Sequence, residues 1–155
     1  MPAASEGGAA PALPRTWRPL GPRIVGLAVT LMLIAVVAVG WFSFDDETRS
    51  RFTTLQRGTL TFFGLLYLAL MFGLLRSRAV AYADRLVVVN GFRRREFSWP
   101  QIVAARLPPG APWVTLDLAD GETCSVMGIQ ASDGARARRA LADLRRLVDG
   151  AHPAG

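Results

Sequence analysis

The chain has 155 residues, of which 51% are hydrophobic, 19% charged and 9% aromatic, and its formal net charge is +6. All 18 basic residues are arginines, and the chain contains one cysteine and one histidine. These counts exclude a disulfide framework and a metal cluster built from cysteine and histidine, so we expect no metal and no cofactor. The charge is modest and no aromatic platform accompanies it, which argues against nucleic acid as a partner.

Residues 1–23 predict a disordered N-terminal tail. Alanine, proline, glycine and serine dominate its first 14 residues, and such a segment buries too little apolar surface to offset chain entropy. Two uncharged apolar blocks follow, at residues 24–44 and 58–75, joined by a connector at residues 45–57. At 1.5 Å per residue the blocks span roughly 31 and 27 Å, close to the thickness of a bilayer core. Each block therefore predicts a transmembrane helix.

Two alternatives explain the blocks less well. Two buried helices of a soluble protein would need more cover than the 80 residues after the second block provide. A cleaved signal peptide would need an apolar core of 7–15 residues, whereas the first block is longer and continues through Trp41 and Phe44.

The arginines predict the orientation of this hairpin. Six lie close to the spans outside the hairpin and three lie in the connector. The positive-inside rule therefore predicts a multi-pass protein of the cell membrane with both termini in the cytoplasm and an extracytoplasmic connector. Neither span holds an ionisable residue, which argues against an ion or proton pathway. Ala69 and Gly73 form a small-xxx-small pair that predicts close helix packing, within the hairpin or in a homodimer.

Residues 79–150 change to short runs separated by turns, a pattern typical of antiparallel strands. Val80 and Tyr82 indicate one strand and residues 86–89 another, followed by the hairpin dipeptide Asn90-Gly91. A tight turn there puts Val89 opposite Phe92 and Arg85 opposite Glu96. A further strand is expected at residues 102–107.

Residues 113–127 predict a second hairpin that turns at Asp120-Gly121. Leu116 and Leu118 share a face with the apolar residues of the return strand only if the loop has three residues, with Gly121 in the left-handed region. A closing helix follows, with Asp133 as its N-cap, Gly150 at its end and residues 151–155 as a frayed tail. Its apolar stripe consists of Ala137, Ala140, Leu141, Leu144, Leu147 and Val148.

These elements match a known family in several short stretches: residues 99–102 (WPQI), 112–114 (PWV), 116–121 (LDLADG) and 127–130 (MGIQ). Residues 79–150 resemble the bacterial PH-like domain of two-span actinobacterial membrane proteins, the group named after low-molecular-weight protein antigen 6. The resemblance implies a transmembrane hairpin followed by a PH-like fold, in which two packed antiparallel sheets are closed by one C-terminal helix. It implies no activity. In this sequence the arginine cluster follows the Asn90-Gly91 turn, which departs from the eukaryotic phosphoinositide-binding pattern. We therefore do not transfer a phosphoinositide site to this chain.

The sequence offers one candidate binding patch, Arg93, Arg94 and Arg95. Arginines near an inner leaflet attract anionic headgroups, but a solvated strand explains the same residues. No catalytic residue is expected. Cys124 fits a core position, and His152 lies close to the chain end. Four acidic residues occur outside any known catalytic motif. They are Glu96, Asp117, Asp120 and Glu122.

These observations favour a membrane-anchored interaction module without catalysis. Its PH-like domain is expected to bind a protein, a peptide or an anionic lipid surface at the cytoplasmic face. The alternative is an accessory subunit of a larger membrane complex, with its specificity in the transmembrane helices.

Overall fold

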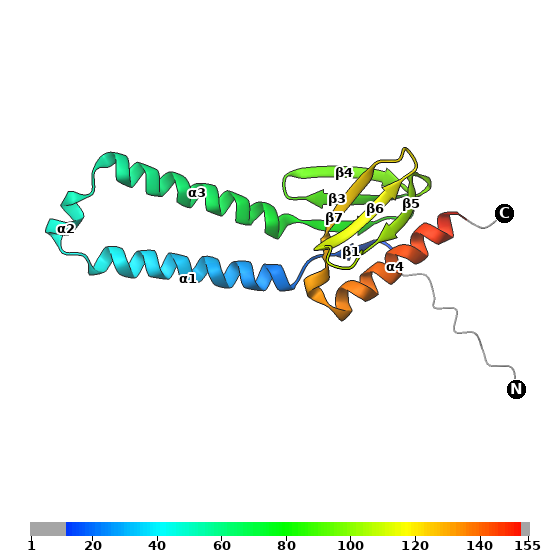
Figure 1. The fold of residues 1–155 in the computed structure, drawn as a ribbon, viewed down its shortest axis with the longest axis horizontal. Helices are drawn as coiled ribbons and strands as arrows, with labels where there is room; N and C mark the ends of the chain where they lie inside the picture. Colours follow the sequence, from blue (N-terminus) through cyan, green and yellow to red (C-terminus); the bar gives the residue numbers. More distant parts are fainter. Residues whose placement is uncertain (1–11, 153–155) are drawn as a thin grey trace, which may run out of the picture. The chain divides into compact units, whose positions relative to one another are not determined.

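The structure is a computed structural model that describes residues 12–152, and it divides into two compact units. One unit is a helical hairpin, Leu20–Arg76 (Figure 1). The other is a β-rich domain that combines the described residues up to Pro19 with those from Ser77 onward. The domain is therefore assembled from two stretches of chain on either side of the hairpin.

The hairpin consists of α1 (Gly21–Ser43), the short α2 (Asp46–Arg51) and α3 (Thr54–Arg76). Helices α1 and α3 have 23 residues each and are long and apolar enough to cross a membrane. Helix α3 begins before the predicted block because Thr53 and Gln56 cap it reciprocally, each accepting the other's backbone N–H, at 3.2 and 3.0 Å. Helix α2 lies inside the predicted connector, where Asp45 accepts the N–H of Thr48 at 2.9 Å.

Seven strands form two antiparallel sheets, and one helix closes the domain. The first sheet has the order β1-β2-β3-β4 and the second has the order β5-β6-β7. Short 3-10 turns at Trp99–Gln101 and Ala131–Asp133 precede β5 and the closing helix. The elements are β1 (Arg15–Trp17), β2 (Arg78–Ala81), β3 (Arg85–Asn90), β4 (Arg93–Ser98), β5 (Ile102–Arg106), β6 (Trp113–Leu118), β7 (Thr123–Gln130) and α4 (Ala135–Ala151).

Strand β1 corrects the prediction of a disordered tail over residues 1–23. It pairs antiparallel with β2, with Thr16 opposite Val80 and Trp17 opposite Ala79, and the Trp17 side chain is buried in the core. A partner strand more than 60 residues away in the sequence supplies the pairing and the burial, so local composition does not reveal the strand. Residues 1–11 of the predicted tail lie outside the described residues.

The β3–β4 hairpin forms at the predicted place with a different register. Asn90 lies opposite Arg93, so the loop is Gly91-Phe92 and Arg85 faces Ser98 rather than Glu96. This register pairs Leu86 with Phe97, both of which are buried in the core. A buried pair on one face outweighs the opposite-charge pair on which the prediction relied.

The prediction for the β6–β7 hairpin is confirmed. Leu116 lies opposite Cys124 and Val114 opposite Val126, and the N–H of Leu118 donates to the carbonyl of Glu122 at 2.9 Å across a three-residue loop. Gly121 has φ +83°, a conformation that glycine adopts without steric cost.

The two sheets meet where β7 crosses β2. A Cβ atom on Gly128 would lie 2.5 Å from the backbone nitrogen of Ala79 and 2.7 Å from the carbonyl carbon of Arg78. Only glycine allows this approach. The core lies between the sheets and α4, and its largest fully buried side chains include Leu86, Ile102, Leu116 and Leu144.

Helix α4 packs on the domain through the predicted stripe, from Ala137 to Val148. Its N-cap is Gly134, which makes no side-chain capping bond, and Asp133 lies in the preceding 3-10 turn. The prediction of Asp133 as the cap is therefore wrong. The helix ends at Ala151, one residue beyond the predicted stop.

Candidate functional site

The predicted patch Arg93–Arg95 divides into one arginine without an ion pair and two that are paired. All three side chains are exposed on β4. Arg94 lies 2.5 Å from Glu96, and Arg95 lies 3.5 Å from Glu122 with its guanidinium 5.1 Å from the centre of the Phe97 ring. Arg93 has no ion-pair partner within residues 12–152. The patch is therefore less positive than its sequence indicates.

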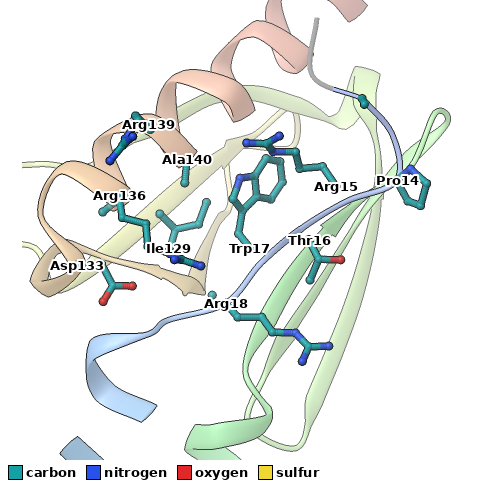
Figure 2. Close-up of a pocket in the computed structure, with 13 residues that line it drawn as sticks. Pro14, Arg15, Thr16, Trp17, Arg18, Ile129, Asp133, Arg136, Arg139 and Ala140 are labelled. Atoms are coloured by element: carbon teal, nitrogen blue, oxygen red, sulfur yellow. The ribbon is translucent and has the colours of Figure 1, made fainter. Parts of the chain in front are cut away.

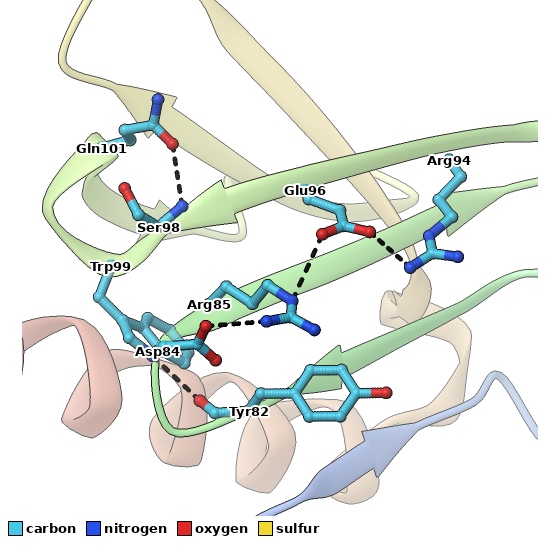
Figure 3. Close-up of polar contacts among 8 residues, drawn as sticks. All are labelled: Tyr82, Asp84, Arg85, Arg94, Glu96, Ser98, Trp99 and Gln101. Carbon is cyan, nitrogen blue, oxygen red and sulfur yellow. Dashed lines mark hydrogen bonds and ion pairs between the residues drawn. The ribbon is translucent and has the colours of Figure 1, made fainter.

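Arg94 and Glu96 belong to a chain of ion pairs on the outer face of the first sheet (Figure 3). Arg85 lies between two carboxylates, 2.8 Å from Asp84 and 3.3 Å from Glu96, and over the ring of Tyr82. Two arginines alternate with two acidic residues, so this face carries no net charge at its centre. Exposed pairs of this kind contribute little to stability.

The β3–β4 hairpin is held firmly at its tip. The Asn90 side chain donates to the carbonyl of Ser125 at 2.5 Å and accepts the N–H of Met127 at 3.0 Å. The N–H of Gly91 donates to Ser77 Oγ at 3.0 Å, and Ser77 directly follows the last residue of α3. The next residue in the loop, Phe92, is 65% exposed. The tip therefore presents an aromatic ring and Arg93 from a turn that Ser77 and β7 hold within the domain.

A second arginine-rich region, which the sequence did not predict, surrounds a cavity of about 520 Å³ between β1, the end of β7 and the start of α4 (Figure 2). Four arginines line it: Arg15, Arg18, Arg136 and Arg139. Trp17 also lines it, and the indole N–H of Trp17 is buried without a hydrogen-bond partner. This region could not be predicted from the sequence, because its two parts lie more than 100 residues apart and the first part falls within the predicted disordered tail.

Cys124 occupies the predicted core position. It is 5% exposed on β7, and burial raises the pKa of its thiol, an effect that nearby Arg95 partly opposes. A thiol kept protonated in this way is a poor nucleophile.

The acidic residues considered for catalysis have structural partners. Asp117 lies 2.5 Å from Arg106, and Asp120 accepts the N–H of Glu122 at 2.9 Å within the β6–β7 turn. Glu96 and Glu122 pair with arginines of β4. His152 lies at the end of α4, where its Nδ1 is 3.1 Å from the carbonyl of Val148. No three metal-ligating side chains gather anywhere in residues 12–152.

The predicted packing pair in the hairpin is divided between two environments. Gly73 is buried, whereas Ala69 is exposed. The polar contact within the hairpin is made elsewhere: Thr30 donates to the carbonyl of Gly26 at 2.7 Å and lies 3.0 Å from the Tyr67 hydroxyl. Gly26 and Thr30, which have the same small-xxx-small spacing, are the buried residues of α1.

Comparisons with known proteins agree with this architecture. A sequence model of the family described as bacterial PH domain matches residues 76–147. The chain is 30% identical over 132 residues to the uncharacterized proteins Rv1417 of Mycobacterium tuberculosis and Mb1452 of Mycobacterium bovis, which covers 85% of this chain and 84% of each relative. No solved structure matches it at a significant level. With two sheets, a closing helix and two apolar helices that precede most of the domain, the chain belongs to the bacterial PH domain family.

Proposed function

We propose that this protein is a membrane-anchored binding module without catalysis, whose PH-like domain contacts the anionic lipid surface at the cytoplasmic face of the membrane. The observation that carries the proposal is the bond between Gly91 and Ser77, which ties the exposed tip of the β3–β4 hairpin to the residue that follows α3.

The insertion of the hairpin into the domain supports the anchoring. Three residues separate Trp17 of β1 from the start of α1, and one residue separates the end of α3 from β2. At about 3.5 Å per Cα–Cα step, the four steps from Trp17 to Gly21 and the two steps from Arg76 to Arg78 reach only roughly 14 and 7 Å. The pairing of β1 with β2 also requires both ends of the hairpin to lie on one side of the membrane, and the excess of arginines at those ends favours the cytoplasmic side.

The chemistry of the tip supports lipid as the partner. Phe92 is exposed, and Arg93 next to it has no carboxylate partner among residues 12–152. Arg78, on β2 and two residues after the end of α3 in the sequence, likewise forms no ion pair with any described residue. An aromatic ring beside free guanidinium groups suits the headgroup region of a bilayer, where each arginine near an anionic surface contributes about 1 kcal/mol.

The test uses the full chain in lipid nanodiscs with an environment-sensitive dye at position 92. The variant Phe92→Cys is labelled in a Cys124→Ala background, in neutral discs and in discs containing phosphatidylglycerol. Anchoring is the same in both discs, so the difference between them measures attraction to anionic lipid. We expect a larger blue shift in the anionic discs, and we expect Arg93→Gln to weaken the preference for anionic lipid roughly fivefold.

A matched control places the dye on Val103→Cys, which lies on β5 and is 59% exposed in the wild type. Its spectrum should be the same in both discs. Equal spectra at position 92 in neutral and anionic discs would refute the proposal. A reporter fused at Gly155 that is active only in the cytoplasm tests the membrane face separately.

The accessory-subunit function is a second candidate, supported by a cavity of about 550 Å³ in the hairpin. It is lined by apolar residues of α1 and α3, such as Val37, Trp41 and Leu68, and its chemistry suits a helix from a partner or a second copy. Replacing both long helices with an unrelated hairpin of equal length separates the two functions. A lipid response that survives the replacement favours the module, and its loss favours the subunit.

A further inference from the structure

The cavity between β1, β7 and α4 is lined by more arginines than carboxylates. Arg15 is engaged, because it lies 2.7 Å from Asp143 of α4. Arg18, Arg136 and Arg139 form no ion pair with any residue of the described range. Among the described residues that line the cavity, Asp133 carries the only carboxylate. The cavity therefore has an excess of guanidinium donors.

Trp17 adds a donor that the domain does not satisfy. Its side chain is 7% exposed, and its indole N–H has no hydrogen-bond partner. Figure 2 shows the indole nitrogen on the side of the ring that faces α4, with the Arg15 guanidinium beside it. Most buried polar groups in proteins are hydrogen-bonded, so an unpaired one requires an explanation. An acceptor bound in the cavity provides that explanation.

The start of α4 adds a third observation. Arg136 and Arg139 lie in the first turns of a 17-residue helix whose first turn has no acidic residue and whose N-cap makes no side-chain bond. The N-terminus of a helix carries partial positive charge and unpaired N–H groups, which favour anions and disfavour arginine. The arrangement is unfavourable when empty and favourable around a bound anion.

We propose that this cavity binds a phosphate group. Arginine forms paired hydrogen bonds with phosphate oxygens, and the ligand would receive them from Arg136 and Arg139, with the Trp17 N–H as a further donor and Arg18 adding positive charge at the edge of the cavity. The Arg15 guanidinium lies beside the buried indole nitrogen and its side chain is 45% exposed (Figure 2), so binding at this nitrogen requires Arg15 to move aside. The phosphate comes from a lipid headgroup or from a soluble phosphate compound, which share this chemistry.

Nuclear magnetic resonance of the full chain in nanodiscs, labelled with ¹⁵N, tests the proposal. The chain has four tryptophans, so the indole N–H groups give four signals, and that of Trp99 already donates to the carbonyl of Tyr82 at 3.1 Å. Titration with pyrophosphate in neutral discs probes the soluble source. Discs containing phosphatidylglycerol, without added phosphate, probe the lipid source. We expect a saturable shift of the Trp17 signal in at least one arm, while the signals of Trp41 and Trp99 stay unchanged.

Three variants assign the effect to the cavity. The double variant R136Q/R139Q should weaken binding at least tenfold, because it removes two charged donors. Its control, R106Q/R138Q, removes the same charge outside the lining of this cavity and outside the β3–β4 tip, and it should bind as the wild type does. Trp17→Phe keeps the ring and removes the N–H, so it should weaken binding roughly tenfold without lowering thermal stability. Binding by Trp17→Phe is followed by the backbone amide of Ala137 at the start of α4.

Each outcome decides between the sources or overturns the site. A shift with pyrophosphate alone assigns a soluble phosphate compound, and a shift with phosphatidylglycerol alone assigns a lipid headgroup. An unmoved Trp17 signal in both arms overturns the proposal, as does equal loss of binding in R136Q/R139Q and R106Q/R138Q. This site is separate from the β3–β4 tip, so the two proposals can fail independently. The dye at position 92 tests the contact of the tip with lipid, and the Trp17 signal tests binding in the cavity.

Discussion

The close approach of β7 to β2 makes Gly128→Ala a sharp test of how the two sheets join. The new methyl group would lie 2.5 to 2.9 Å from three backbone atoms of Arg78 and Ala79. Backbone atoms cannot turn aside as a flexible side chain does, so β7 must move away from β2. Overpacking of this kind costs about 1–3 kcal/mol. We expect the upper part of that range, less the small gain from a stiffer unfolded chain.

The expected net loss of about 2–3 kcal/mol lowers the melting temperature of a domain of this size by roughly 10–20 °C. Near-ultraviolet circular dichroism of the full chain in nanodiscs measures it, because three of the four tryptophans lie in the domain. The control is Gly150→Ala on α4, where nothing lies within 4 Å of the new methyl group and stability should rise slightly. A melting temperature for Gly128→Ala within a few degrees of the wild type would refute this account of the sheet junction.

Three further predictions use the same melting measurement. Trp17→Ala should cost about 3–5 kcal/mol because it empties a core position, and no loss would show that β1 is not part of the domain. Asn90→Ala should cost about 1–3 kcal/mol, since it leaves the N–H of Met127 without its acceptor; wild-type stability would mean that the tip is not held as described. Burial raises the pKa of the Cys124 thiol. Above the ordinary thiol pKa of about 8.5, the thiol is therefore still protonated in the folded protein but ionised in the unfolded chain, and the free energy of unfolding falls as the pH rises. Cys124→Ala has no thiol, so its melting temperature should fall less at alkaline pH than that of the wild type. Melting temperatures that fall in parallel for both proteins would contradict this prediction.

The order of the elements in the C-terminal part follows from local patterns. Alternation along β6 and β7, together with Gly121, indicated the three-residue loop, and the helical spacing of apolar residues indicated the buried face of α4. These signals are local, because side-chain period and turn chemistry act over a few residues.

The β3–β4 register shows where local reasoning fails. A turn dipeptide allows neighbouring registers, and the pairing of buried Leu86 with buried Phe97 decides between them. The expected partners Arg85 and Glu96 still form an ion pair, but from positions that are not directly opposite. Long flexible side chains reach across a small offset, so a charge pair is a weak indicator of register.

Strand β1 and the cavity beside it depend on contacts that are distant in the sequence. Arg15–Trp17 is too short for a periodic signal, and its partner β2 follows the whole hairpin. The same separation conceals that Arg136 and Arg139 line the same cavity as Trp17. Prediction of this site requires the pairing of β1 with β2, which composition and periodicity do not contain.

The pairing of β1 with β2 across the hairpin is the central claim, and a crosslink in native membranes tests it most directly. Thr16→Cys and Val80→Cys place thiols on residues that are directly opposite, at a spacing that a disulfide spans. The background is Cys124→Ala, and a protease site is inserted in the connector between α2 and α3. After oxidation and cleavage, the two fragments should stay joined until a reductant is added, whereas the control pair Thr16→Cys and Val103→Cys should separate. Separation of the Thr16 and Val80 fragments without reductant would contradict the account.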